Sequence, residues 1–81
     1  MTIIFLYNLI YLQFSEFFRE LRERAGLTQR QLGKILNKPQ SYIYNCETAN
    51  RRVDITEFIE WSKGCKISPK EAFRQYLSSV E

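Results

Sequence analysis

The chain of 81 residues has no histidine, only two cysteines, three glycines and two prolines. Zinc sites and many nucleophilic active sites need histidine or closely spaced cysteines, and the sequence has no C-x-x-C pair. It also shows no pair of carboxylates in a plausible site and no glycine-rich loop that would hold a phosphate. We therefore expect no enzyme activity, no metal and no cofactor.

The two cysteines, Cys46 and Cys65, lie nineteen positions apart, and each falls in a pattern typical of an apolar helix face. Thiols in such positions behave as small buried hydrophobic groups and stay reduced in the cytoplasm. We expect both to be free and buried, in a cytoplasmic protein.

Charge is modest in total and uneven in distribution. The net charge is +3, but the segment from Arg19 to Arg52 has eight cations against three acids, a net of +5. From Val53 onward there are four cations against five acids. A basic segment of this kind is expected of a phosphate-binding face, although a solvated helix surface gives similar counts.

The first fourteen residues carry no charge and are rich in Ile, Leu, Phe and Tyr. This stretch is shorter than the roughly 20 apolar residues that span a membrane, and it lacks the cationic start and cleavage site of a secretory signal. Ile3, Leu6, Ile10 and Phe14 fit a helical stripe, while the composition also allows a strand or a disordered tail. We favour a helical arm, residues 1–14, that packs on the domain or on a partner subunit.

From residue 15 the pattern predicts helices with recognisable ends. Ser15 is expected to cap a first helix that ends at Gly26, and Thr28 with Gln31 forms a capping box that opens a second helix. Asn37 should end that helix, because asparagine tolerates the left-handed conformation. Pro39 suits the first turn of a third helix, which runs to about residue 47.

Two further helices follow a polar connector at residues 48–53. Asp54 and Glu57 form the capping box of one, and Ser68 with Pro69 opens the other. The sequence therefore predicts an all-α fold of five helices in one domain, residues 15–81. The residues expected to face its core from these last two helices are Ile55, Phe58, Ile59, Ser62, Ala72, Phe73, Tyr76 and Leu77.

Residues 28–47 form a pair of short helices joined by a tight turn, and Gly33 of the first helix is expected to face that turn. A residue without a side chain there lets the two helices approach closely, as in a helix-turn-helix. The alternative is that Gly33 is a plain helix defect that costs about 1 kcal/mol relative to alanine.

Several linked motifs resemble the Cro/repressor type of helix-turn-helix, also called the Xre family. They are LRERAGLTQ at 21–29, QLG at 31–33, KPQSYI at 38–43, ET at 47–48 and RRVD at 51–54. The resemblance covers about residues 17–77 and implies a lambda-repressor-like bundle that binds double-stranded DNA.

The resemblance also implies roles for single residues. Base edges would be read by Gln40, Ser41, Tyr42 and Asn45, which suits the hydrogen-bonding capacity of Gln, Asn and Ser. Gln29 would contact a phosphate and brace Gln40. The other phosphate-contacting candidates are Arg30, Lys38, Tyr44 and Arg51.

Further positions imply packing and turns. Ile43 and Cys46 would pack against Leu32 and Ile35, and Glu47 would form an ion pair with Arg51 or Arg52. The sequence departs from the family where glycine is usual, with Asn37, Ala49 and Lys66; of these turns, Asn37 and Asn50 are expected to tolerate left-handed conformations. Tyr44 would stack near the DNA backbone or contact a protein, and Trp61 is expected to anchor the core and not a dimer.

The leading interpretation is a DNA-binding transcription regulator, located with the nucleoid, that binds a near-palindromic operator as a homodimer. A phage repressor, the antitoxin of a toxin–antitoxin pair and a restriction-modification controller all fit this length. The alternative is a protein-interaction module that docks on a toxin, a membrane surface or another subunit through residues 1–14 and binds DNA secondarily.

Overall fold

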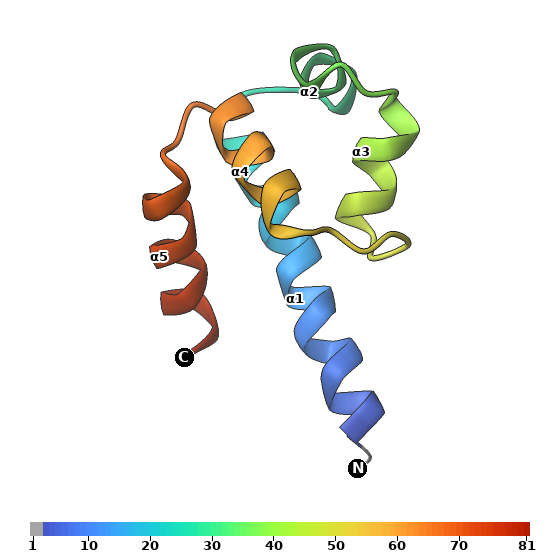
Figure 1. Ribbon diagram of the computed structural model, residues 1–81, viewed down its shortest axis with the longest axis vertical. Coiled ribbons are helices and arrows are strands. Elements are labelled where there is room, and N and C mark those ends of the chain that lie inside the picture. The colour runs from blue at the N-terminus through green and yellow to red at the C-terminus, as the bar shows by residue number, and fades with distance from the viewer. Residues whose placement is uncertain (1–2) are drawn as a thin grey trace.

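Five helices and no strand make up residues 3–81, the part of the chain that the computed structural model describes. They are α1 (Ile3–Arg24), α2 (Gln29–Leu36), α3 (Gln40–Glu47), α4 (Ile55–Gly64) and α5 (Pro69–Val80). Figure 1 shows α1 along the length of the molecule, with α3 on one side, α5 on the other and α2 near the carboxyl end of α1. The prediction of an all-α bundle of five helices is confirmed.

Helix α1 is longer than the sequence predicts. It passes through residue 15, so the prediction that Ser15 caps a helix is wrong. The side chain of Ser15 is buried, and its hydroxyl has no hydrogen-bond partner in the described part of the chain. The helix continues upstream because Phe14 packs its ring at 4.8 Å from Phe18 and 5.2 Å from Tyr76. Tertiary packing of an apolar face stabilises helix beyond what local signals indicate.

The helical form of the amino-terminal arm is thereby confirmed for residues 3–14, against a strand or a disordered tail. Figure 1 shows the first turns of α1 projecting past the other helices. Met1, Thr2 and the side chains of Ile3 and Leu6 in the predicted stripe lie outside the described residues. The division into an arm, 1–14, and a domain, 15–81, stays a prediction.

Apart from Ser15, the helix ends follow the predicted residues with one further exception, at Pro39. Thr28 with Gln31 and Asp54 with Glu57 form complete capping boxes, and the Ser68 side chain accepts a hydrogen bond from the Glu71 amide. Pro39 is the residue before α3 and not part of its first turn, because its ψ of 158° is extended. A proline at that position still fixes the angle at which the chain enters the helix.

The core is built around Trp61, as predicted. Its indole is fully buried, stacks on Phe18 with ring centroids 4.7 Å apart, and donates a hydrogen bond of 3.1 Å to the Phe18 carbonyl. Phe58, also on α4, stacks on the rings of Phe14 and Phe18. A buried tryptophan with a satisfied N–H fixes α4 against α1.

Several apolar residues predicted to face the core are exposed instead, and these predictions are wrong: Ile55, Ile59, Phe73 and Leu77. The buried stripe of α4 and the residue after it is Phe58, Trp61, Ser62 and Cys65, with the spacing of one helix face. Ile55 and Ile59 lie four residues apart on the neighbouring face. On α5, the predictions for Ala72 and Tyr76 hold, since these residues are buried and half-buried.

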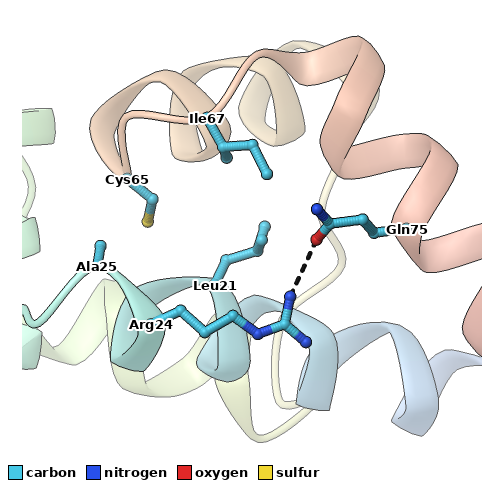
Figure 2. A pocket seen from close by; sticks show the side chains of 6 residues that line it. All are labelled: Leu21, Arg24, Ala25, Cys65, Ile67 and Gln75. Carbon is cyan, nitrogen blue, oxygen red and sulfur yellow. Dashed lines mark hydrogen bonds between the residues drawn. The ribbon is translucent and has the colours of Figure 1, made fainter.

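A pocket of about 150 Å³ lies between the carboxyl end of α1, the segment between α4 and α5, and α5 itself. Figure 2 shows Arg24 reaching across to Gln75, with a hydrogen bond of 2.9 Å between the two side chains. The other residues that line the pocket are Leu21, Ala25, Cys65 and Ile67. None of the residues predicted to contact DNA lines this pocket, so it is separate from the helix-turn-helix surface.

Candidate nucleic-acid interface

The turn between α2 and α3 depends on Gly33. A Cβ at this position would lie 2.7 Å from the backbone oxygen of Lys38, closer than a carbon atom can come. The Lys38 amide donates a hydrogen bond of 2.8 Å to the Gly33 carbonyl, and Asn37 takes the left-handed conformation with φ of 57°. Gly33 therefore allows the turn to fold back on α2, as predicted, and is not a plain helix defect.

The inner face of α3 packs as predicted, with one correction. Ile43 and Cys46 are fully buried in the same core cluster as Leu32. Ile35 is 51% exposed, so its predicted packing against α3 is wrong. Leu32 lies four residues before Leu36 on the face that turns toward the core, whereas Ile35 lies at its edge. The buried face of α3 leaves its opposite face accessible to a ligand.

A chain of polar contacts runs beneath the start of α3. Arg22 of α1 donates from Nε to Glu47 Oε2 at 2.6 Å and from Nη2 to Glu47 Oε1 at 3.0 Å. Glu47 Oε1 also accepts a hydrogen bond of 3.1 Å from Gln29 Nε2, and Gln29 Oε1 accepts one of 3.1 Å from Gln40 Nε2. The predicted bracing of Gln40 by Gln29 is thus confirmed, and it is anchored on a buried ion pair.

Glu47 pairs with Arg22, so the prediction that it pairs with Arg51 or Arg52 is wrong. The side chains of Arg22 and Glu47 are only 11% and 2% exposed. The hydrogen bonds to Glu47 raise the pKa of Arg22 above its ordinary range, and burial opposes this only in part. Glu47 lies in the last turn of α3 and faces α1, whereas Arg51 lies in the connector between α3 and α4, residues 48–54, and faces α4.

A second cluster joins the outer side of α3 to α4. Arg51 forms an ion pair of 2.7 Å with Glu57, and its guanidinium lies 4.7 Å from the ring centroid of Tyr42. The Tyr42 hydroxyl donates a hydrogen bond of 2.9 Å to Glu57, and the Lys38 ammonium lies 5.1 Å from the centroid of the same ring. Cations over the ring face and a carboxylate at its edge suit the charge distribution of an aromatic ring.

Burial and the hydrogen bond to Glu57 together raise the pKa of Tyr42, so its phenol stays protonated. For Glu57, burial acts to raise the pKa, but hydrogen bonds from the Asp54 amide, Tyr42 and Arg51 outweigh it and the pKa is lowered. Glu57 is therefore an ionised carboxylate that lies between the neutral phenol of Tyr42 and the cationic guanidinium of Arg51.

The remaining candidates on α3 differ in exposure. Gln40 and Ser41 are exposed at its start, and Tyr44 is 50% exposed. Asn45 is half-buried, and its carbonyl accepts a hydrogen bond of 3.0 Å from the Asn50 amide. Of the four residues predicted to read bases, Gln40 and Ser41 therefore have accessible side chains, whereas Tyr42 and Asn45 are partly buried.

Basic side chains surround Gln40. Arg30, Lys34 and Lys38 line one open depression beside it, and Arg30 also lines a second with Gln29. Within residues 3–81 none of these three cations forms an ion pair, and no carboxylate lines that first depression. Cations of this kind next to exposed amide and hydroxyl groups match the surface that a nucleic-acid duplex requires.

Sequence reasoning missed two residues of this region, Arg22 and Tyr11. Arg22 stood in the motif at 21–29, but only the folded chain shows that it faces α3 from α1. Tyr11 donates a hydrogen bond of 2.8 Å to the Arg51 carbonyl across 40 residues of sequence. Apolar patterning gave no signal for either contact, because both join elements that are distant in sequence.

The described residues contain no group of three or more His, Cys, Asp or Glu side chains placed to hold a metal ion. Cys46 and Cys65 are free and buried, as predicted, and burial raises the pKa of Cys65 to about 11. Across the same part of the chain, no helix combines the length and apolarity needed to cross a membrane.

Comparisons with known proteins agree with this geometry. A family model described as a helix-turn-helix domain matches residues 13–72. Among solved structures, an XRE-family like protein from Pseudomonas syringae pv. tomato is 29% identical, with a TM-score of 0.81 and coverage of 94% of this chain and 93% of that one. No curated protein sequence matches the chain.

Two regulators with solved structures are also similar. The restriction-modification controller protein C.AhdI from Aeromonas hydrophila is 27% identical, with a TM-score of 0.70 and coverage of 76% of this chain and 90% of that one. The clp gene regulator ClgR from C. glutamicum is 15% identical, with a TM-score of 0.76 and coverage of 89% and 94%, which shows a shared fold.

Proposed function

The chain belongs to the helix-turn-helix domain family, of the Xre type, and we propose that this DNA-binding regulator reads a specific operator by placing α3 in the major groove. The observation that supports the proposal best is the chain of contacts from the buried Arg22–Glu47 pair through Gln29 to Gln40. It holds the first side chain of α3 in place before DNA arrives, and preorganised contacts lose less entropy on binding.

Base reading is proposed for Gln40, Ser41, Asn45 and Tyr42. Gln40 and Ser41 are exposed at the end of α3 that enters the groove first, and a glutamine amide can pair bidentately with adenine. The Tyr42 hydroxyl is engaged by Glu57, so Tyr42 would meet a base through its ring, as an apolar contact with a thymine methyl group.

Phosphate binding is proposed for Gln29, Arg30, Lys38, Tyr44 and Arg51. Arg30 and Lys38 flank Gln40, and the guanidinium of Arg51 shares the ring of Tyr42 with Lys38, so these cations would bind the DNA backbone beside the first half of α3. Contacts of this kind fix the position of the protein on the duplex and carry no sequence information. Tyr44 adds a half-exposed ring on the same helix.

We further propose that the protein acts as a homodimer on a near-palindromic operator, in the cytoplasm at the nucleoid. One α3 helix reads one half-site, and a two-fold pair of such helices reads two half-sites about one helical turn apart. The similarity to most of the length of C.AhdI favours a restriction-modification controller over a phage repressor or an antitoxin. The protein is a DNA-binding regulator and not an enzyme, and we propose that it acts by occupying DNA.

Selection from a pool of random duplexes, followed by titration at rising salt, tests this proposal. We expect enrichment of a near-palindromic sequence, with affinity that falls by roughly three orders of magnitude between 50 and 200 mM salt. Lys38→Ala should weaken binding and flatten the salt dependence, whereas Lys70→Ala, the same charge change on α5, should not. Failure to enrich any sequence, or an affinity indifferent to salt, would reject the proposal.

A second candidate function is favoured by the exposed apolar residues of α1. Leu9, Ile10 and Leu12 are 44%, 52% and 46% exposed. Leu9 and Leu12, three residues apart, lie on one face of the helix, and a contiguous exposed apolar patch marks a protein-interaction site. We propose that this arm docks a protein partner, such as a toxin or another subunit.

A triple variant separates the two functions. Replacing Leu9, Ile10 and Leu12 by Gln keeps helix-forming residues and removes the apolar surface. If the arm docks a toxin, the variant should lose toxin binding and keep its operator affinity. If the arm docks a second subunit, the variant should lose dimerisation and keep only the affinity of one subunit for a single half-site. An unchanged assembly state and unchanged partner capture would contradict the docking role.

A further inference from the structure

The amino-terminal part of α1 touches the connector that follows the proposed recognition helix. Tyr11 donates a hydrogen bond of 2.8 Å from its hydroxyl to the Arg51 carbonyl, and the guanidinium of Arg52 lies 4.4 Å from the centroid of the Tyr11 ring. Burial raises the pKa of Tyr11, so its hydroxyl remains a hydrogen-bond donor. One side chain of α1 thus holds the backbone of one connector residue and the side chain of the next.

Tyr11 is itself held firmly. Its ring lies 6.1 Å from that of Phe14, which packs against Phe18 and Phe58 in the aromatic core. The position of Tyr11 is therefore tied to the packing of the α1 rings against Phe58 of α4. A contact from such a support restricts its partner more than a contact between two mobile surface groups does.

The connector, residues 48–54, needs such a contact. It is polar, it is largely exposed, and it contains Ala49 in the left-handed conformation with φ of 62°. Hydrogen bonds of Thr48 and Asn50 join it to α3 at one end, and the ion pair between Arg51 and Glu57 joins it to α4 at the other. Val53 packs against the core near the end of the segment, and Tyr11 adds a point of attachment from α1 in its middle.

Arg52 is an exposed cation that lies five positions after Glu47, the last residue of α3. Stacking on the Tyr11 ring restricts the rotamers of its long side chain. A guanidinium has five N–H donors, so it can bind an anion while it also serves other acceptors. The anion that a DNA-binding surface meets next to its recognition helix is a backbone phosphate.

We propose that Tyr11 is a positioning residue for DNA binding, which fixes the connector and presents Arg52 to a phosphate beside the groove that α3 occupies. This inference rests on the proposed function, since it assumes that α3 enters DNA. It gives the amino-terminal part of α1 a role in DNA affinity that is separate from any docking of proteins.

Variants of both residues test the proposal on the full chain, with the operator obtained by selection and a random duplex of equal length. Arg52→Ala should lower affinity for both duplexes by the same factor, roughly fivefold, and should reduce the salt slope by about one for each bound subunit. Tyr11→Leu should do the same, and should add little in the Arg52→Ala background, because the two residues act together.

Two further variants separate positioning from simple stability. Tyr11→Phe keeps the ring under Arg52 and removes the hydrogen bond to Arg51, so it should keep the salt slope of the parent protein. Tyr76→Phe, in the same aromatic cluster but remote from the connector, should change neither affinity nor slope. Thermal unfolding of each variant establishes that it is folded at the temperature of the titration.

The outcomes distinguish this inference from the proposed function. If the parent protein binds its operator and Arg52→Ala keeps the parent salt slope, the phosphate role is overturned while the proposed function stands. If Tyr11→Leu lowers affinity without changing the slope, Tyr11 is merely structural and the positioning role is overturned. If the parent protein enriches no duplex, the proposed function itself fails, and this inference fails with it.

Discussion

Arg22 and Glu47 show how much of the interface depends on single side chains below it. Both side chains are almost fully buried, and Glu47 accepts hydrogen bonds from Arg22 and from Gln29. Removing one member of a buried pair leaves the other charge without compensation, which usually costs several kcal/mol. The pair matters for the interface because Gln29 in turn holds Gln40.

We expect Arg22→Ala to lower the free energy of unfolding by about 3 kcal/mol, because Glu47 is left buried and unpaired. Urea unfolding monitored by circular dichroism measures the change. Arg19→Ala is the matched control, since Arg19 and Glu23 form an exposed pair at 4.0 Å, and it should cost less than about 1 kcal/mol. Equal effects of the two substitutions would contradict the role given to the buried pair.

Three residues other than glycine adopt positive φ in the described part of the chain: Asn37, Ala49 and Lys66. These are the three positions at which the sequence departs from the glycines usual in the family. The prediction that Asn37 takes a left-handed conformation is confirmed, whereas in the second turn Ala49 takes it and not Asn50. The fold thus imposes a left-handed backbone at these positions, and a residue with a Cβ adopts that conformation at an energetic cost.

Ala49→Gly and Lys66→Gly should each stabilise the protein by about 1 kcal/mol, because glycine has no Cβ penalty at a left-handed position. Lys63→Gly, within α4, is the control and should destabilise, since glycine is unfavourable inside a helix. Thermal unfolding gives the order of the three midpoints. A loss of stability in both Ala49→Gly and Lys66→Gly would show that these turns are not strained.

At the scale of the helices, the sequence predicted features that depend on neighbouring residues and missed those that depend on contacts between distant residues. The capping boxes at Thr28 and Asp54 could be predicted because each lies within four residues of sequence. The start of α1 could not, because it depends on Phe14 packing against Phe18 and Tyr76. The partner of Glu47 was missed for the same reason, as Arg22 lies 25 residues away.

The contact between α3 and α4 makes a prediction about pH. Glu57 has a lowered pKa in the folded protein, relative to its ordinary value of 4.5. A group with a lowered folded pKa contributes stability at pH values above its unfolded pKa, and this contribution is lost as the pH falls through the folded pKa. The stabilisation by Glu57 should therefore be complete near neutral pH and disappear in acid.

Glu57→Gln should reduce the free energy of unfolding at pH 7, and the difference from the parent protein should shrink below about pH 4. Urea unfolding at a series of pH values measures this difference. Glu60→Gln, an exposed substitution on the same helix, controls for the change in net charge. A difference that stays constant from neutral pH into strong acid would contradict the ionic role of Glu57.

At the scale of the molecule, the basic surface and most of the exposed apolar residues lie on different elements. The cations of the helix-turn-helix surround Gln40, while most of the exposed apolar residues occur on α1, α4 and α5. Ile35 on α2 and Tyr44 on α3 are also exposed. The sequence predicted the first surface through its motifs and basic segment. It did not predict which apolar residues remain exposed, because a stripe of Ile and Phe marks a helix face without showing whether another helix covers it.

The central claim is that the exposed start of α3 reads DNA sequence, and the most direct test is the ratio of operator to random-duplex affinity in a variant with Gln40→Ala and Ser41→Ala. At about 1 to 3 kcal/mol for each lost base contact, the ratio should fall at least about thirtyfold, with random-duplex affinity and the circular dichroism spectrum unchanged. A folded variant that keeps the parent ratio would contradict the account.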